Sequence, residues 1–130
     1  MSPQPHVLVI DDDADMRMLM GALLEHLGAR VDSAGSANEI DPILAQSADL
    51  ILLDLVMPPG IYDACVQRLL ESGAHARVCL LSGSSAQALA QERARIDALG
   101  LRTTSPITKP ARLDALASLP ADFMADGRDD

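Results

Sequence analysis

The sequence predicts a doubly wound α/β fold, in which five parallel strands form one sheet with helices on both faces. Three short, mostly apolar runs support this prediction, at residues 6–10, 49–53 and 77–81. Runs of this length are typical of strands that helices cover on both faces. Between them, apolar residues recur every three or four positions, as they do on one face of a helix. The chain order is therefore predicted to be βαβαβαβαβα.

Two further strands and the first helix carry weaker signals. Strands are expected at residues 29–33 and at about residues 101–108. The first helix is expected to end at Gly28, because glycine readily adopts the backbone conformation that closes a helix. Its sheet-facing residues, three or four positions apart, are predicted to be Met16, Leu19, Met20, Leu23 and Leu27.

Local signals mark the ends of the other helices. Residues 36–39 and 84–87 each fit a capping box, in which side chains satisfy the first free amides of a helix. One helix is expected after Pro59 and another from Pro110, since proline suits the first helical turn. Gly100 is expected just past the end of the helix that the second capping box begins.

Length and composition indicate a single globular domain. The chain has 130 residues, of which 48% are hydrophobic and 22% are charged. Residues 1–120 are expected to form the domain and residues 121–130 a disordered acidic tail. No apolar run approaches the roughly 20 residues that span a bilayer, and no secretory signal is recognisable. We therefore expect a cytoplasmic protein without membrane association, in which Cys65 and Cys79 are reduced thiols.

The formal net charge of -9 argues against direct binding to nucleic acid. A surface of this sign repels phosphodiester backbones. Tyr62 and Phe123 are the only aromatic residues of the chain, so it also lacks a platform on which bases could stack.

Residues with reactive or charged side chains follow the predicted strands at their carboxyl ends. In a doubly wound sheet these ends meet at the edge where ligands bind. Crowded carboxylates repel one another, and a hard divalent cation such as Mg2+ (or Mn2+) relieves that repulsion. A metal ion, an ammonium group and a hydroxyl around one carboxylate form a site for a phosphoryl group. The candidates are Asp11, Asp12, Asp54, Ser82 and Lys109, whereas Asp13 is expected to cap a helix or to be solvated.

Four segments together resemble the signature segments of the receiver domains of bacterial two-component response regulators. They are residues 7–13, 52–58, 80–83 and 107–110, and they occur in the family's order on the expected strands. The resemblance extends over residues 6 to about 119. It implies the CheY-like, flavodoxin-like strand order 2-1-3-4-5.

The resemblance also implies a role for each candidate residue. Asp54 would be the phosphorylated nucleophile. Asp12 and Asp54, with the backbone carbonyl of Val56, would bind the metal directly, and Asp11 would act largely through water. Ser82 would move toward the phosphoryl group and Lys109 would pair with it. The implied partners are a histidine kinase or phosphotransfer protein, an output domain or effector outside this chain, and a second copy of the chain in a homodimer.

The sequence departs from the family pattern at three places. Pro106 stands where the family usually has an aromatic residue that reports phosphorylation, so an output surface of a different kind is expected around the switch positions Ser82 and Pro106. Residues 59–63 are a distorted version of the usual turn after Met-Pro. The stretch between Ser82 and Lys109 is longer than usual and resembles receivers joined to EAL-type cyclic-di-GMP phosphodiesterases.

The residues that flank the candidate site predict slow self-dephosphorylation. Val56 and Ser84 offer no carboxamide or carboxylate group that would orient a water molecule for attack on the phosphoryl group.

Two other functions remain open at this point. A haloacid-dehalogenase-type phosphotransferase also uses an aspartate after its first strand, and Asp11 and Asp13 form its Asp-x-Asp pair. A phosphotransferase of that type would leave Asp54 without a role. We therefore expect a protein that catalyses only its own phosphorylation and dephosphorylation, and not an enzyme that turns over a separate substrate. The second alternative is a receiver-like module that binds partners without phosphorylation. The acidic pair, Asp54, Ser82 and Lys109 argue against this module, while Pro106 leaves it open.

Overall fold

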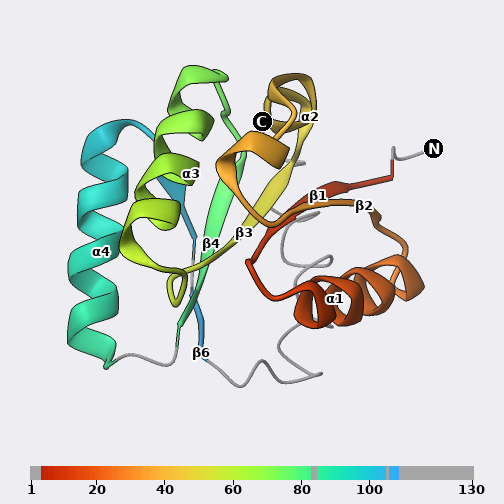
Figure 1. The fold of residues 1–130 in the computed structure, drawn as a ribbon, viewed down its shortest axis with the longest axis horizontal. Coiled ribbons are helices and arrows are strands. Elements are labelled where there is room, and N and C mark those ends of the chain that lie inside the picture. The colour runs from red at the N-terminus through yellow and green to blue at the C-terminus, as the bar shows by residue number, and fades with distance from the viewer. Residues whose placement is uncertain (1–3, 83–84, 105, 109–130) are drawn as a thin grey trace.

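The computed structural model describes residues 4–82, 85–104 and 106–108, and strands and helices alternate along them (Figure 1). The strands are β1 (His6–Ile10), β2 (Arg30–Ala34), β3 (Leu50–Asp54), β4 (Arg77–Ser82), β5 (Arg102–Thr103) and β6 (Ile107–Thr108). The helices are α1 (Ala14–His26), a 3-10 turn η1 (Ala37–Glu39), α2 (Pro42–Ser47), α3 (Pro59–Glu71) and α4 (Ala86–Leu99). The helix expected from Pro110 and the tail expected at residues 121–130 lie outside the described residues.

The strands form one parallel sheet in the order that the resemblance implies. The order is β2-β1-β3-β4-β5, and β6 also pairs with β4. The strand predicted at about residues 101–108 is thus divided into two short segments beside β4. Pro106 directly precedes the second segment, and proline has no amide hydrogen to donate to a sheet ladder.

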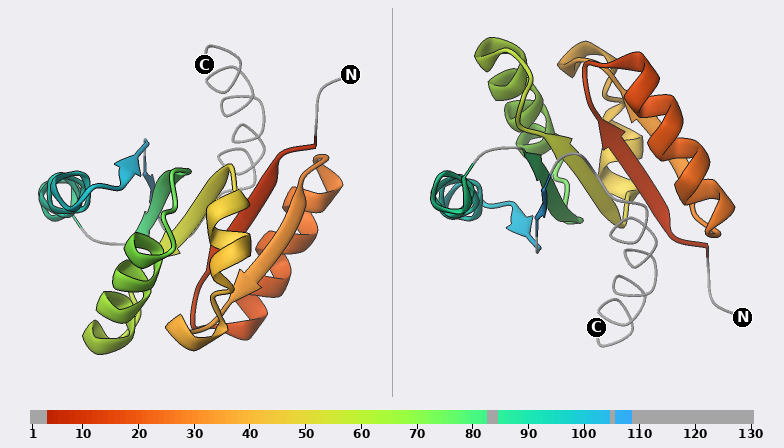
Figure 2. Two further views of the ribbon diagram at one scale, coloured as in Figure 1. Left: turned by 90° about the horizontal axis from the view of Figure 1, so that it is seen from above. Right: turned by 90° about the horizontal axis from the view of Figure 1, so that it is seen from below.

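The sheet separates two hydrophobic clusters, and successive residues of β1, β3 and β4 alternate between them. One cluster joins strand residues such as Leu8, Ile51 and Leu80 to α2, α3 and α4. The other joins Val9 and Leu52, among others, to α1. The two end-on views of Figure 2 show the strands as a twisted layer with the helices around it. Helices therefore cover both faces, as predicted, and burying each large aliphatic side chain contributes roughly 1.5–3 kcal/mol.

The two cysteines are both buried, neither is in a disulfide, and they lie in different clusters. Cys65 belongs to the cluster on the α3 face and Cys79 to the cluster on the α1 face. The sheet thus stands between them. Burial raises the pKa of the Cys65 thiol to about 11.

The buried face of α1 agrees with the predicted one in part, because Met16, Met20 and Leu23 all pack in the cluster on the α1 face. Met20 and Leu24 are fully buried, whereas Leu19 is 55% exposed and Leu27 is 39% exposed. The helix begins at Ala14 behind an Asp13 cap, and Leu24, which was not among the predicted residues, packs beside Met20 in the cluster. Leu27 follows the last helical residue and is therefore no longer on the buried face of the helix.

The helix caps also differ in detail from the predicted ones. Ser36 makes no capping hydrogen bond, and the Asp41 side chain caps α2 instead by accepting from the amide of Ile43. The cap of α4 is Ser85, one residue later than expected. Gly28 and Gly100 follow their helices with positive φ angles of 103° and 115°, as predicted for residues that close a helix.

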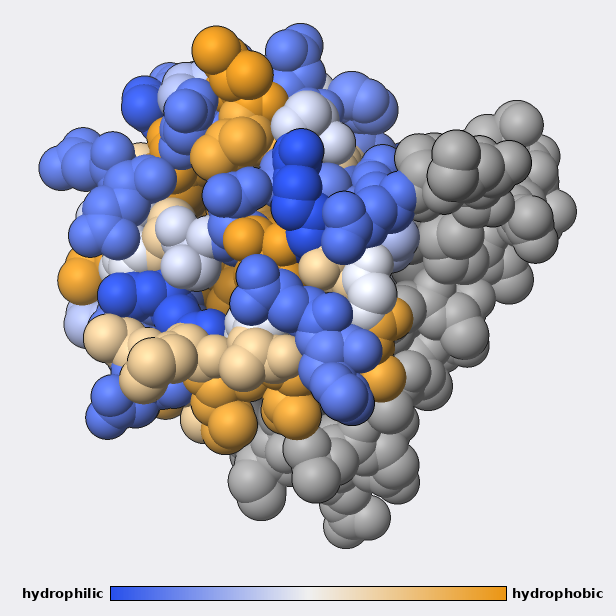
Figure 3. Space-filling model, turned by 90° about the vertical axis from the view of Figure 1, so that its right-hand side faces the viewer, coloured by the Kyte–Doolittle hydropathy of each residue, from blue (hydrophilic) through white to orange (hydrophobic). Residues whose placement is uncertain are grey.

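The surface around α1 and α2 carries exposed apolar side chains. Figure 3 shows hydrophobic groups among hydrophilic neighbours on this side of the molecule. Met18 and Leu19 of α1 and Ile43 of α2 are each more than half exposed. Among the described residues, no helix is both long and apolar enough to cross a membrane.

Candidate functional site

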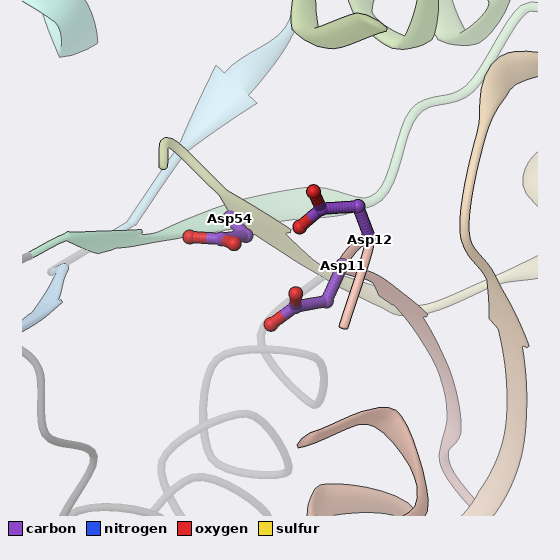
Figure 4. A group of neighbouring side chains, drawn as sticks. All are labelled: Asp11, Asp12 and Asp54. Atoms are coloured by element: carbon purple, nitrogen blue, oxygen red, sulfur yellow. The ribbon is translucent and has the colours of Figure 1, made fainter. Parts of the chain in front are cut away.

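Three carboxylates meet at the carboxyl ends of the two central strands. Asp11 and Asp12 follow β1, and Asp54 is the last residue of the neighbouring strand β3. Ile10 pairs with Leu53, so Asp11 and Asp54 extend to the same level of the sheet. One carboxylate oxygen from each of the three lies within 4.8 Å of the others. Figure 4 shows the three groups around a common space, so the expected approach of these side chains is observed.

The three carboxylates differ in their exposure to solvent. Asp11 is fully buried and Asp54 is 2% exposed, whereas Asp12 is exposed. Two buried groups of the same charge beside a third are unfavourable by themselves, because the low-dielectric interior strengthens their repulsion. The arrangement suits a cation that enters from solvent on the side of Asp12.

Backbone amides hold the turn that carries Asp11 and Asp12. The Asp13 amide donates to Asp11 Oδ1 at 2.9 Å. The Asp13 carboxylate in turn accepts from the amides of Asp15 and Met16 at 3.0 and 3.3 Å, which confirms that Asp13 caps α1. The same short sequence thus ends a strand, presents two carboxylates and starts a helix.

A second turn fixes Asp54. Its Oδ1 accepts a hydrogen bond of 3.0 Å from the amide of Val56. The amide of Leu55 donates to the carbonyl of Leu81, which keeps the chain beside β4 for one residue beyond the strand. Val56 itself is 63% exposed and Met57 is buried, so the loop is anchored at both sides of Val56 while Val56 faces solvent.

The remaining predicted residues are described only in part. Ser82 is the last residue of β4 and its backbone pairs with Thr108, which places it along the same edge of the sheet as Asp54. Pro106 is half-buried in front of β6. Lys109 lies outside the described residues.

Arg17 is a neighbour of the site that the sequence did not reveal. Its guanidinium Nη1 donates to the backbone carbonyl of Asp11 at 2.7 Å. It lies beside Gly35, where an added Cβ would come within 2.6 Å of the same nitrogen. The interval of six residues between Asp11 and Arg17 has no local meaning on a helix or a strand, so only the folded turn brings the two together.

A pocket of about 510 Å³ adjoins the site between α3 and α4. Leu55 and Met57 line it from the loop after β3, and a polar network crosses it. The Tyr62 hydroxyl donates to Glu92 Oε2 at 2.5 Å, and Arg95 pairs with Glu92 at 2.7 Å. Burial, and then the Glu92 carboxylate, raise the pKa of Tyr62 above its ordinary value. Burial opposes ionisation of Glu92, but the hydrogen bonds from Arg95 and Tyr62 outweigh it and lower the pKa of that carboxyl.

His6 begins β1, at the opposite edge of the sheet from the three carboxylates, and its side chain is buried. Only 4% of it is exposed, and its Nε2 lies 2.7 Å from Asp32 Oδ2. Its Nδ1 lies 3.4 Å from the hydroxyl of Ser47, and its amide donates to Asp49 at 2.9 Å. Nothing in the sequence indicates this cluster, because its members come from three separate stretches of the chain.

The receiver family and two curated relatives match this chain. The family model described as response regulator receiver domain matches residues 7–119. Autoinducer 1 sensor kinase/phosphatase LuxN of Vibrio campbellii and its namesake in Vibrio harveyi are each 31% identical to the chain over 114 residues. The match covers 86% of this chain but only 13% of those proteins, so the chain spans about an eighth of their length.

Solved structures share the fold at low sequence identity. A response regulator from Colwellia psychrerythraea is 21% identical, with a TM-score of 0.76 over 95% of this chain and 99% of that one. The chemotaxis protein CheY4 of Vibrio cholerae is also 21% identical, with a TM-score of 0.73 over 93% and 99% of the two chains. A CheY-like receiver domain protein from Methanospirillum hungatei is 16% identical and reaches 0.75 over 98% and 100%.

The family match runs through every described strand of the sheet, and the acidic edge lies where β1 and β3 end. This chain belongs to the response regulator receiver domains of two-component signal transduction.

Proposed function

We propose that Asp54 is the residue that accepts a phosphoryl group. The observation that carries this assignment is its place at the end of β3, 2% exposed and next to the carboxylates of Asp11 and Asp12. The Val56 amide donates a hydrogen bond to the Asp54 carboxylate and so helps to orient it. In the reaction, an Asp54 oxygen forms a bond to phosphorus while the bond from phosphorus to the donor's leaving group breaks.

The donor set fits Mg2+ or Mn2+. All candidate ligand atoms are oxygens, which hard divalent cations prefer. Asp12 and Asp54 would hold the ion together with the carbonyl of Val56, and Asp11 would act largely through water. When bound, the ion supplies positive charge that offsets the carboxylates and the incoming phosphoryl oxygens. Ser82 and Lys109 are proposed to bind the phosphoryl oxygens through their hydroxyl and ammonium groups.

The proposed phosphoryl donor is a histidine kinase or a phosphotransfer protein. The proposed recipients of the signal are an output domain or effector outside these residues, and a second copy of the chain. The proposed location is the cytoplasm. The net charge of -9 supports protein partners over nucleic acid. That the receiver is joined to an EAL-type cyclic-di-GMP phosphodiesterase domain remains a prediction from the sequence.

Intact-mass spectrometry after incubation with acetyl phosphate and Mg2+ tests the assignment. We expect one phosphoryl adduct on the wild-type chain, none on Asp54→Asn, and none when EDTA removes the metal. Asp63→Asn is the matched control, because Asp63 is an exposed aspartate on α3. An adduct that persists in Asp54→Asn would contradict the assignment.

The same samples separate the alternative functions. A folded wild-type chain without an adduct would favour the module that binds partners without phosphorylation. Steady hydrolysis of a small phosphate ester would favour the dehalogenase-type phosphotransferase. We expect neither result, since the only phosphoryl chemistry proposed is the phosphorylation and dephosphorylation of Asp54 itself.

A further inference from the structure

We infer that Arg17 is a positioning residue for the metal site: it fixes the peptide that joins Asp11 to Asp12. This inference rests on the proposed function, because it assigns a role toward the cation that those carboxylates would hold. Arg17 lies in the first turns of α1, directly behind the turn that carries the two aspartates. Its side chain reaches back to that turn instead of into solvent.

The hydrogen bonds around Asp11 show what Arg17 restrains. The Asp11 amide donates to the carbonyl of Ala34 at 3.1 Å, so its amino side is held by the end of β2. The Asp11 carbonyl accepts from Arg17 Nη1 at 2.7 Å, so its carboxyl side is held by α1. That carbonyl and the amide of Asp12 belong to one rigid peptide plane. Fixing the carbonyl therefore also fixes the direction in which the exposed Asp12 side chain leaves the backbone.

Gly35 provides the space that this arrangement needs. A Cβ at position 35 would lie 2.6 Å from Arg17 Nη1 and 3.2 Å from its Cζ. The amide of Gly35 donates to Glu39 Oε1 at 2.7 Å, which holds the loop against the guanidinium. Because the atom in conflict is the end of a flexible side chain, Gly35→Ala is expected to displace Arg17 rather than to unfold the loop. The variant moves the guanidinium without removing its charge.

Charge and position predict opposite effects, which makes the role of Arg17 testable. If Arg17 acted only through its positive charge, its removal would make the carboxylates more attractive to a cation and would tighten Mg2+ binding. If it positions the Asp11–Asp12 peptide, its removal weakens Mg2+ binding although a positive charge has been lost. The direction of the change in affinity therefore distinguishes the two roles.

The experiment is a calorimetric Mg2+ titration of the folded chain, without any phosphoryl donor. We expect Arg17→Met to raise the Kd for Mg2+ by about 10-fold, the scale of losing one charge-assisted hydrogen bond. Gly35→Ala should raise the Kd in the same direction, and Arg17→Lys, which keeps a donor, should restore part of the affinity. Arg30→Met is the matched control, since Arg30 is an exposed arginine on β2, and its Kd should stay within about 2-fold of wild type.

Thermal denaturation of each variant without metal shows that the titrated chain is folded. A Kd for Arg17→Met equal to or below the wild-type value would overturn the positioning role while leaving the metal site intact. If Arg17→Met does not fold, Gly35→Ala provides the test instead. A Kd for Gly35→Ala equal to that of the wild type would then overturn the positioning role of Arg17. A folded wild-type chain that binds no Mg2+ would contradict the proposed metal site itself, and the inference with it.

Discussion

A polar side chain is buried at each end of β1, but the two side chains have different kinds of neighbour. At the amino end, His6 lies beside the carboxylate of Asp32, the hydroxyl of Ser47 and the side chain of Asp49. At the carboxyl end, Asp11 lies beside the carboxylates of Asp12 and Asp54. The same five-residue strand thus joins a complementary cluster to a cluster of like charges.

This difference shows that burial alone does not identify a functional group. The His6 cluster supplies acceptors and a donor from within the protein, so its polar atoms are satisfied when the chain folds. Within the part of the chain that the structure describes, the acidic cluster brings three carboxylates together, and a favourable partner for such a cluster is a cation. We therefore assign the amino end of β1 to stability and the carboxyl end to function.

The largest expected effect comes from removing one charge of the acidic cluster. Asp11→Asn should stabilise the metal-free fold by on the order of 1–3 kcal/mol, because like charges less than about 5 Å apart repel with energies of this size. The same change should abolish most of the rise in melting temperature that Mg2+ gives the wild type, since a ligand stabilises only the state that binds it. Urea denaturation with and without Mg2+ measures both effects. If the metal-free Asp11→Asn chain were less stable than the wild type, the claim that carboxylate repulsion destabilises this end of β1 would be wrong.

A smaller, purely structural effect is expected at the other end of the strand. His6→Ala should lower the free energy of unfolding by about 1–3 kcal/mol, because it leaves polar groups of the cluster without their hydrogen-bond partner. Its Kd for Mg2+ should equal that of the wild type. Urea denaturation and a Mg2+ titration check the two statements. A large loss of Mg2+ affinity would mean that the two ends of β1 are not independent.

The hydrogen-bonded group of Tyr62, Glu92 and Arg95 tests more closely whether complementary polar groups serve stability alone. Its members are complementary in charge, as in the His6 cluster, but the group adjoins the candidate metal site. Tyr62→Phe removes the hydroxyl that donates to Glu92 and should cost about 1 kcal/mol without changing Mg2+ binding. The effect also has a pH signature. Since the pKa of Tyr62 is raised above its ordinary 10.0, its contribution is complete below pH 10 and is lost as the pH rises further. Urea denaturation above pH 10 should therefore bring wild type and Tyr62→Phe closer together in stability.

The smallest effect concerns the lifetime of the phosphoryl group. Val56 is 63% exposed beside Asp54 and offers no group that could orient a water molecule. Val56→Asn places a carboxamide there and should speed loss of the phosphoryl group several-fold, with stability unchanged. Intact-mass spectra collected over time after removal of the donor measure the rate. A Val56→Asn adduct as long-lived as that of wild type would show that position 56 does not control the water.

The sequence predicted the central strands and the acidic edge well because both depend on local patterns. Continuous apolar runs located β1, β3 and β4 to within one residue, and the residues that end β1 and β3 are the aspartates that meet in the fold. Parallel strands leave no choice about which ends come together, so the edge could be predicted without knowing any contact.

The features that the sequence missed depend on contacts between distant segments. His6 is buried because β2 and the end of α2 cover it, and nothing within a few residues of position 6 indicates that cover. Arg17 reaches Asp11 only because Gly35 leaves space on a neighbouring loop. The spacing of apolar residues correctly predicted that Met20 of α1 packs on the sheet, but it did not separate the buried Leu24 from the exposed Leu19. The division of the last strand into β5 and β6, with Pro106 directly before the second segment, was not predicted.

A map of backbone amide chemical shifts during a Mg2+ titration tests the assignment of the two ends of β1 most directly. The account predicts saturable shifts at residues 11–13 and 54–57, and none at His6, Asp32 or Ser47. The Asp54→Asn chain should show weaker binding at the same residues. Shifts spread evenly over the acidic surface, or concentrated around His6, would contradict the claim that the carboxyl end of β1 is the metal site.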